Sequence, residues 1–369
     1  MAGMSDQFSE TTSQSWLSRL GGALMGVLFG LLLLAAAGWL AFWNEGRAIT
    51  TARSLAEGAG LVVSVDATRP DPAHAGRLVH VAAPVRVAEI PRDGLLGAAP
   101  PPGTLRLVRT VEMFQWREEE RSETRTKLGG GTETVTTYAY TRGWQEGRVD
   151  SSRFRRPEGH DNPQPTHASR SFTAPGASLG GFRLTAQQLE AIPAEEALGE
   201  PRFIGADPQN PRVGDLRVTW RVARPEALSV VAAQMGEGFG PYPTRAGDRL
   251  FLLETGQVPA AAMFRAAERE NAMLTWALRA VMAVMVFIGF ALVLNPLKVL
   301  ADVIPPIGAV VGFGTGFVAL VLTLLVAPTL VALAWLAVRP LLALALLAGG
   351  GAAAYAVLRW RRAARPAMA

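Results

Sequence analysis

An apolar run near the start of the chain constrains the fold more than any other feature. Residues Leu20 to Trp43 carry no ionisable side chain, and about 20 apolar residues are enough for a helix to cross the hydrocarbon core of a bilayer. Trp39 and Trp43 stand where aromatic side chains meet the interface between lipid and water. The run continues past its alanine triplet, which argues against a cleaved signal peptide. The sequence therefore predicts a membrane protein with residues 19–43 as its first transmembrane helix.

Three further apolar segments lie in the last third of the chain. They predict an amphipathic helix continuing into a second transmembrane helix over 259–295, a third over 305–336 and a fourth over 340–358. We expect Asn295–Pro296 to stop the second helix, because proline interrupts helical hydrogen bonding. The chain is thus predicted to cross the membrane four times.

Four crossings would put both chain ends on one side of the membrane. Arginines cluster in residues 359–369, and cytoplasmic flanks of membrane helices are rich in Lys and Arg. The prediction is therefore a basic cytoplasmic tail at 359–369 and a cytoplasmic tail at 1–18, which is polar and disordered over Met1–Ser15. Residues 44–258 would form an exoplasmic domain, periplasmic in a bacterium or lumenal in a eukaryote.

The domain over 44–258 reads as a large strand-rich α+β fold. Its clearest element is a long β-hairpin, in which Val111–Arg125 and Thr132–Val149 flank the triplet Gly129–Gly131. We favour a partly closed β-barrel, because closure removes exposed strand edges. Other predicted elements are strands at Leu61–Val65, Arg77–Val87, Leu216–Val222, Leu228–Ala233 and Arg249–Glu254, and helices at Ile49–Glu57 and Leu184–Ile192, the latter with Thr185 as its N-cap.

Short matches spread along most of the chain resemble one family. They are Ser15–Arg19, Phe42–Ala48, Leu55–Gly60, Met113–Trp116, Gly159–Pro163, Val213–Val218, Gly247–Asp248, Asn271, Thr275–Trp276, Leu278–Ala280 and Arg339–Leu341. In this order they resemble the transmembrane protein 43 family, also called LUMA. Ordered matches over most of a chain are a far more specific signal than one short motif.

The resemblance implies a four-span membrane protein with a large lumenal domain. For animal family members it implies the endoplasmic reticulum and inner nuclear membrane, organisation of the nuclear envelope, self-association, and emerin and lamins as partners. It implies no catalytic residue. This chain departs from the family in its third membrane segment and in a composition rich in Ala, Arg and Gly, so the emerin and lamin partners are implied for the animal members only.

His160 and Asp161 form the candidate polar site. A His–Asp pair could ligate a metal or act as acid and base, but we favour a polar loop in which Asp161 sets a turn before Pro163. The triplet Gly129–Gly131 lacks the Lys-Ser/Thr and the helix of a phosphate-binding loop. The chain has no cysteine, which excludes thiolate catalysis and cysteine metal sites. We expect no enzyme activity, metal or cofactor.

Two sets of glycines recur at a spacing of four residues. They are Gly22, Gly26 and Gly30, and Gly308, Gly312 and Gly316. Residues four apart share one helix face, where small side chains let another helix approach closely. That second helix could belong to the same chain or to another copy.

These features predict a function without chemistry. The interiors of the predicted spans carry essentially no charge, which argues against an ion path. We expect a non-enzymatic membrane organiser or scaffold that forms homo-oligomers, with a domain that binds protein or lipid. The alternative is a gating or regulatory subunit of a transporter or channel, and a third class is a membrane-surface enzyme.

The same reading constrains partners and location. We expect membrane lipid as a partner and no nucleic acid, because much of the net charge of +5 lies in the terminal arginines. The expected location is the cell inner membrane if the chain is bacterial, and the endoplasmic reticulum or inner nuclear membrane if it is eukaryotic.

Overall fold

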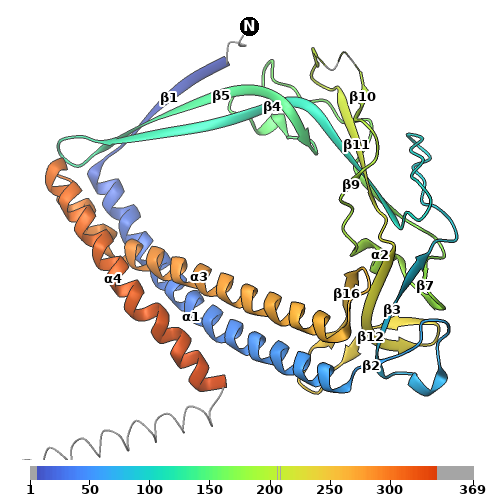
Figure 1. The fold of residues 1–369 in the computed structure, drawn as a ribbon. Coiled ribbons are helices and arrows are strands. Elements are labelled where there is room, and N and C mark those ends of the chain that lie inside the picture. Colours follow the sequence, from blue (N-terminus) through green and yellow to red (C-terminus); the bar gives the residue numbers. More distant parts are fainter. Residues whose placement is uncertain (1–5, 206, 208, 339–369) are drawn as a thin grey trace, which may run out of the picture. The chain divides into compact units, whose positions relative to one another are not determined.

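The computed structural model describes residues 6–205, 207 and 209–338 (Figure 1). The described chain divides into two compact units. The helical unit comprises residues 14–53, 126–132 and 269–338, and the strand-rich unit comprises residues 6–13, 54–125 and 133–268. The chain therefore passes between the two units several times.

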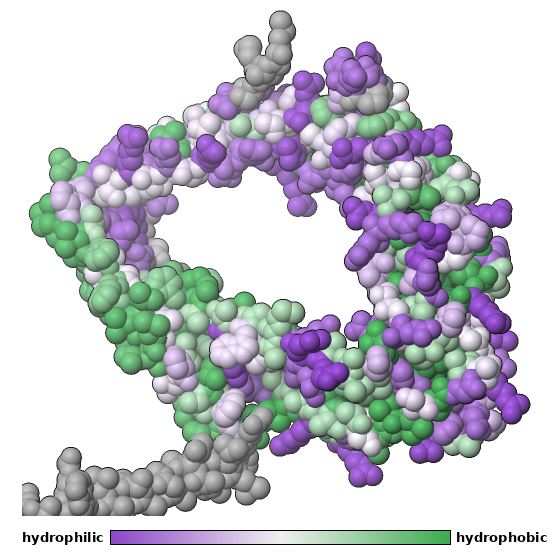
Figure 2. Space-filling view, viewed as in Figure 1, coloured by the Kyte–Doolittle hydropathy of each residue, from purple (hydrophilic) through white to green (hydrophobic). Residues whose placement is uncertain are grey.

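Three long helices dominate the helical unit. They are α1 (Trp16–Leu61), α3 (Ala260–Ala301) and α4 (Pro305–Val338), and each is long and apolar enough to cross a membrane. All three contribute to one small core, made by Ala37, Ala41, Met282, Val286 and Ala327. Most other large side chains on these helices are exposed and apolar, as the green surface along them in Figure 2 shows. Apolar surface around every side of a helix is typical of a segment that contacts lipid.

The helices differ from the prediction at their ends. The helix predicted over Ile49–Glu57 is the last part of α1, so the chain does not leave the helix at Asn44. Pro296 lies inside α3, which continues to Ala301, and the predicted stop at Asn295–Pro296 is wrong. Proline is tolerated in membrane helices because neighbouring groups satisfy the freed carbonyl. The predicted fourth span at 340–358 and the basic tail at 359–369 lie outside the described residues, so three candidate spans are found and not four.

The first sheet of the strand-rich unit contains the predicted hairpin. Its strand order is β1 (Asp6–Gln14), β5 (Thr132–Glu146), β4 (Arg106–Thr126), β11 (Leu216–Ala223) and β10 (Arg202–Ile204), with β6 (Arg170–Thr173) on β4 and β9 (Glu196–Ala197) on β11. Buried and less buried residues alternate along β4 and β11, as expected for strands with one face on a core. The hairpin and the strand over Leu216–Val222 are thus confirmed.

The start of the chain is also part of this sheet. β1 is its edge strand, and the Ser9 and Thr137 hydroxyls are hydrogen-bonded at 2.9 Å. The prediction of disorder for this polar segment is wrong. A polar strand can be stable at a sheet edge because its neighbour satisfies its backbone groups.

The second sheet is built around two central strands, β3 and β12. Its order is β16 (Leu252–Thr255), β12 (Ala227–Met235), β13 (Gly238–Gly240), β8 (Phe182–Arg183), β7 (Ser178–Leu179), β3 (Leu78–Arg86) and β2 (Val63–Ser64), and β12 also pairs with β3. A separate pair is β14 (Tyr242–Pro243) and β15 (Arg249–Leu250). Two sheets with separate apolar cores replace the predicted barrel, and the described strands form no closed barrel.

The short helix α2 (Ala186–Glu190) covers part of the second sheet's core. Thr185 is its N-cap: the Thr185 hydroxyl accepts from the Gln188 N–H, and the Gln188 side chain accepts from the Thr185 N–H. This reciprocal pair satisfies two backbone donors that the first turn leaves free. Leu189 turns inward to the core, as the spacing of Leu184–Ile192 predicts.

Candidate functional sites: polar contacts between the apolar helices

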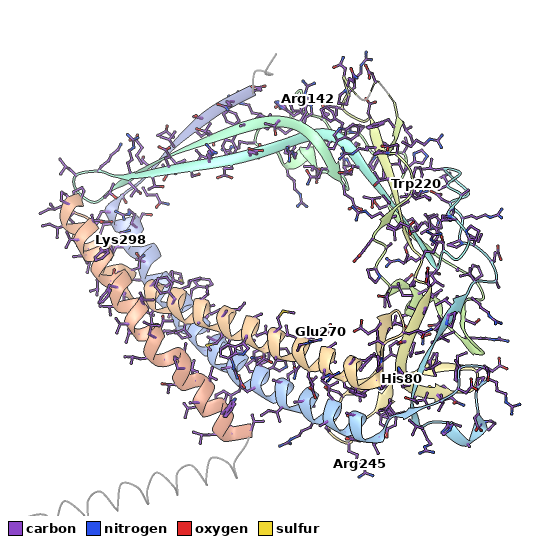
Figure 3. All side chains as sticks on the ribbon, viewed as in Figure 1. His80, Arg142, Trp220, Arg245, Glu270 and Lys298 are labelled. Carbon is purple, nitrogen blue, oxygen red and sulfur yellow. The ribbon has the colours of Figure 1, made fainter. Side chains whose placement is uncertain are left out.

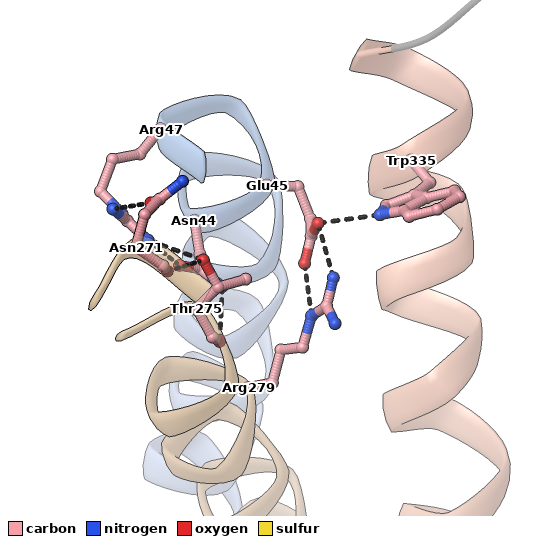
Figure 4. Close-up of polar contacts among 7 residues, drawn as sticks. All are labelled: Asn44, Glu45, Arg47, Asn271, Thr275, Arg279 and Trp335. Carbon is pink, nitrogen blue, oxygen red and sulfur yellow. Dashed lines mark hydrogen bonds and ion pairs between the residues drawn. The ribbon is translucent and has the colours of Figure 1, made fainter. Parts of the chain in front are cut away.

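A buried carboxylate connects all three long helices at one end of the helical unit. Glu45 on α1 accepts hydrogen bonds from Arg279 Nε at 2.7 Å and Nη2 at 2.9 Å on α3, and from Trp335 Nε1 at 2.9 Å on α4 (Figure 4). The Glu45 side chain is 2% exposed. A carboxylate removed from water is stable only when charge-assisted hydrogen bonds satisfy its oxygens. Both oxygens of Glu45 are satisfied here.

A second set of contacts lies beside this ion pair. Arg47 donates to Asn271 Oδ1 and to Thr275 Oγ1, each at 2.9 Å. Asn44 Nδ2 donates to the Thr275 carbonyl at 3.2 Å (Figure 4), and Asn271 Nδ2 donates to the Ala48 carbonyl at 3.0 Å. We call the whole group the polar clamp; its members are Asn44, Glu45, Arg47, Asn271, Thr275, Arg279 and Trp335.

The contacts of the polar clamp hold the three long helices together. Glu45 accepts three hydrogen bonds from the other two long helices, and its side chain is 2% exposed, so its carboxylate serves to join the helices. Arg279 also lies over the Trp276 ring at 4.7 Å, which adds a cation–π contact. The Arg279 guanidinium pairs with Glu45 and does not extend into water. The available signal was that both residues stand at the polar border of an apolar run.

The other end of the helical unit holds a second ion pair. Arg19 on α1 donates to Asp302, just beyond α3, and to the carbonyl of Gly130 in the hairpin turn. The Gly129 N–H donates to the Val303 carbonyl at 3.1 Å. The Arg19 side chain is 13% exposed and the Asp302 side chain is 4% exposed. We call these contacts the tip clasp.

The glycine triplet gives the tip clasp its shape. Gly129 and Gly130 have φ of +86° and +79°, a backbone region that side chains other than glycine seldom adopt. A Cβ at Gly130 would overlap the Trp16 ring, and Trp16 Nε1 in turn donates to the Val299 carbonyl at 2.8 Å. The triplet forms the turn that the sequence predicts. It also contacts Trp16 and the end of α3, which the glycine pattern alone does not indicate.

The first glycine set has three different surroundings. A Cβ at Gly30 would lie 2.7 Å from the Gly289 carbonyl oxygen, so α1 and α3 approach closely there. At Gly26 a Cβ would lie 3.8 Å from Leu292, an ordinary contact. At Gly22 it would meet no atom of the described residues within 4 Å.

The members of the second glycine set also differ in their surroundings. A Cβ at Gly308 would clash with Asp302, and one at Gly312 would lie 3.1 Å from the Lys298 side chain, so both positions lie beneath the turn between α3 and α4 (Lys298 is labelled in Figure 3). At Gly316 a Cβ would meet nothing within 4 Å in the part of the chain that the structure describes.

The candidate pair His160–Asp161 is not held together as a site. His160 is buried, its ring stacks on Tyr140 with centroids 3.9 Å apart, and its Nδ1 is 3.0 Å from the Arg156 carbonyl. The carboxylate nearest to it is Asp6, 3.4 Å from Nε2. Asp161 is exposed. Within the described residues no group of three or more His, Cys, Asp or Glu side chains could hold a metal ion.

The loop that contains His160 is fastened by Asn162. Asn162 Oδ1 accepts from the Trp116 N–H at 2.8 Å, and Nδ2 donates to the Trp116 and Val149 carbonyls. The Tyr140 hydroxyl donates to Glu118 at 2.6 Å. Burial, reinforced by this bond to Glu118, raises the pKa of Tyr140 to about 12. Tyr140 therefore stays protonated and serves as a donor.

A fully buried ion pair lies in the strand-rich unit. Asp93 accepts two bonds from Arg109 at 2.7 and 2.9 Å and one from Trp220 Nε1 at 3.0 Å, and Trp220 projects from β11 (Figure 3). Burial alone would raise the pKa of Asp93, but the bonds from Trp220 and Arg109 outweigh it, so the pKa lies below its usual range. The pair joins the loop at Asp93 to the first sheet.

These units and contacts define a membrane protein in which three apolar helices, joined by buried polar contacts, are combined with a strand-rich unit. The comparisons with known proteins then identify its family. The family model described as "Transmembrane protein 43" matches residues 113–340. The chain belongs to the transmembrane protein 43 family.

Individual relatives match nearly the whole chain. The chain is 35% identical to transmembrane protein 43 of Mus musculus over 354 residues, which covers 88% of each protein. It is 34% identical to that of Homo sapiens over 369 residues (92% and 91%) and 30% identical to the homologue of Drosophila melanogaster over 352 residues (88% and 91%). These names state a membrane location and no enzymatic activity. No solved structure matches the chain.

Proposed function

We propose that the protein is a non-enzymatic membrane organiser, in which the helical unit is a rigid anchor and the strand-rich unit binds protein or lipid partners. The observation that supports this most directly is the pairing of charged side chains in the polar clamp and in the tip clasp. Charged side chains beside the apolar stretches bind one another, Glu45 to Arg279 and Arg19 to Asp302. Such pairs hold helices in place, whereas a transport path needs polar groups that face water or a substrate.

The proposal includes self-association of copies in the membrane. It is supported by Gly22 and Gly316, where an added Cβ would meet nothing within 4 Å among the described residues, and by the resemblance to a family known for self-association. Close approach of backbones at glycine is how membrane helices gain packing energy without a hydrophobic driving force. The compartment we propose is the inner membrane of a bacterium, or the endoplasmic reticulum or inner nuclear membrane of a eukaryote.

Energy transfer between labelled copies in vesicles tests the proposal. The chain has no cysteine, so donor and acceptor dyes can be attached at Ser152→Cys, an exposed position. We expect transfer well above random-collision values at low protein density, and no ion flux across the same vesicles. Transfer at the random level, or a flux that scales with protein, would overturn the proposal.

A matched pair of variants locates the contact. Gly22→Leu and Gly21→Leu place the same side chain at adjacent positions, both open as far as the described residues reach, on helix faces about 100° apart. We expect Gly22→Leu to weaken the transfer and Gly21→Leu to preserve it. Equal effects at both positions would remove the glycine face from the proposal.

A further inference from the structure

A serine and a histidine face each other on neighbouring strands of the second sheet. Ser64 is on β2 and His80 is on β3, and the parallel register of the two strands makes these residues partners. Ser64 Oγ lies 3.1 Å from His80 Nδ1. The Val65 N–H also donates to the His80 carbonyl at 3.0 Å, which holds the end of β2 against β3. The backbone therefore fixes the two side chains at hydrogen-bonding distance.

The other nitrogen of the His80 ring determines how the pair is protonated. His80 Nε2 lies 2.9 Å from the Val258 carbonyl oxygen, and a carbonyl oxygen can only accept a hydrogen bond. Nε2 therefore carries the hydrogen of the neutral imidazole, which leaves Nδ1 as an acceptor. The Ser64 hydroxyl then donates to Nδ1. A base that already accepts the hydroxyl hydrogen is correctly placed to remove it.

The Val258 carbonyl is itself held in place. The Val258 N–H donates to Ser229 Oγ at 2.8 Å, and the Ser229 hydroxyl donates to the Gly256 carbonyl at 2.8 Å. Ser229 is fully buried on β12, the strand that pairs with β3. His80, labelled in Figure 3, is 7% exposed, so packing fixes its ring as well as hydrogen bonding does. A nucleophile, a base and a third group that orients the base are the three parts of an activated nucleophile.

Ser64 is open to solvent, whereas His80 is not. The serine is exposed and lines a groove of about 660 Å³, formed by the end of β2 and the segment that follows it. Thr68, Arg69 and Asp71 also line this groove. Polar and charged side chains offer a long hydrocarbon chain little apolar surface against which to be buried. The groove therefore suits a short acyl group.

We propose that Ser64 is an activated nucleophile that accepts a short acyl group from a carboxylic ester, with His80 as its general base. Ser64 Oγ attacks the ester carbonyl carbon while its proton moves to His80 Nδ1. The bond between that carbon and the alcohol oxygen of the ester then breaks, and the departing oxygen takes the proton from Nδ1. The products are the acyl ester of Ser64 and the free alcohol. The step modifies the protein once, so it adds a reactive position to the membrane organiser and does not depend on that role.

Acetylation by p-nitrophenyl acetate, an activated short-chain ester, tests the proposal. Mass spectrometry of the full-length protein after timed exposure locates each acetyl group. Ser122 is the internal control, because it is also an exposed serine but its hydroxyl lies 3.0 Å from the Thr136 hydroxyl and not beside an imidazole. General-base catalysis contributes about 10²–10⁴-fold, so we expect Ser64 to be acetylated at least about 100 times faster than Ser122. Equal rates at the two serines would overturn the proposal.

His80→Gln separates the base from the structural contacts. A glutamine amide can accept from Ser64 and donate to Val258, as His80 does, but its oxygen is not basic. We expect the variant to remain folded by circular dichroism and to acetylate Ser64 only at the rate of Ser122. Acetylation of Ser64 that stays fast in the folded variant would show that His80 is not the base.

A thiol at the same position gives a second test that leaves His80 unchanged. The chain has no cysteine, so Ser64→Cys and Ser122→Cys each carry a single thiol. An imidazole beside a thiol favours the reactive thiolate. We expect iodoacetamide at neutral pH to alkylate Ser64→Cys about tenfold faster than Ser122→Cys, or more. Similar rates would overturn the proposal, even if His80→Gln failed to fold.

Discussion

Glu45→Ala is the most informative single change in the helical unit. It leaves the Arg279 guanidinium, whose side chain is 19% exposed, without its carboxylate, and leaves Trp335 Nε1 without the acceptor 2.9 Å away. Removing one partner of a buried ion pair costs about 3–5 kcal/mol, because the remaining charge stays out of water. Each kcal/mol lowers the melting temperature by about 2–4 °C in a protein of this size class. We expect the melting temperature to fall by roughly 6–20 °C.

The measurement is thermal unfolding in one mild detergent, followed by tryptophan fluorescence and by size-exclusion chromatography of heated samples. Glu270→Gln is the matched control, because Glu270 is an exposed carboxylate on α3 and surface changes cost within about 0.5 kcal/mol. Trp335→Phe should give an intermediate effect of about 1 kcal/mol, since it removes one donor and leaves the Arg279 bonds in place.

A double variant separates the charge from the packing. In Glu45→Leu with Arg279→Met both charges are gone and apolar side chains fill their places, and such replacements of buried pairs are often neutral or stabilising. We expect it to melt well above Glu45→Ala. If Glu45→Ala melts like the wild type and Glu270→Gln, the clamp does not hold the helices and our reasoning is wrong.

Three further changes test other parts of the structure. Gly30→Leu should lower thermal stability and membrane yield together, because a side chain there meets the Gly289 carbonyl. Gly22→Leu, where an added Cβ meets none of the described residues within 4 Å, should leave both near wild type. Asp93→Asn should lower stability at neutral pH by leaving Arg109 unpaired. It should also reduce the loss of stability at acid pH. The pKa of Asp93 is lowered in the folded protein, so wild-type Asp93 contributes stability above about pH 4 that is lost as the pH falls further. Acid unfolding followed by circular dichroism checks this. Tyr140→Phe should change stability at alkaline pH. The pKa of Tyr140 is about 12 in the folded protein and about 10 in the unfolded chain, so wild-type Tyr140 contributes stability below pH 10 that is lost as the pH rises toward 12. Alkaline unfolding of the variant should lack that loss.

Elements set by neighbouring residues could be predicted from the sequence. The β4–β5 hairpin follows from two strand-forming runs around a glycine triplet, and α2 begins where Thr185 caps it. The long apolar helices follow from composition alone. In each case the decisive interactions lie within a few residues of one another along the chain.

The polar clamp depends instead on residues far apart in sequence. Glu45 and Arg279 are separated by 234 positions and Glu45 and Trp335 by 290, so no local pattern pairs them. β1 shows the same limit: its Ser and Thr content is typical of disorder, and only the partner strand β5 makes it a strand. The barrel prediction was wrong for a related reason, since strand alternation indicates a buried face and does not specify which sheet covers it.

The glycine spacing illustrates how far a periodic pattern can be used. A period of four places Gly22, Gly26 and Gly30 on one helix face, but the face diverges from α3 along its length: Gly30 is pressed against Gly289, Gly26 is in ordinary contact, and Gly22 is open. The same α1 surface therefore packs against α3 at one end and is uncovered by any described residue at the other. A second copy could bind only where α3 does not, so self-association through this face must use its Gly22 end, and a bulky residue at Gly30 would report on folding and not on assembly.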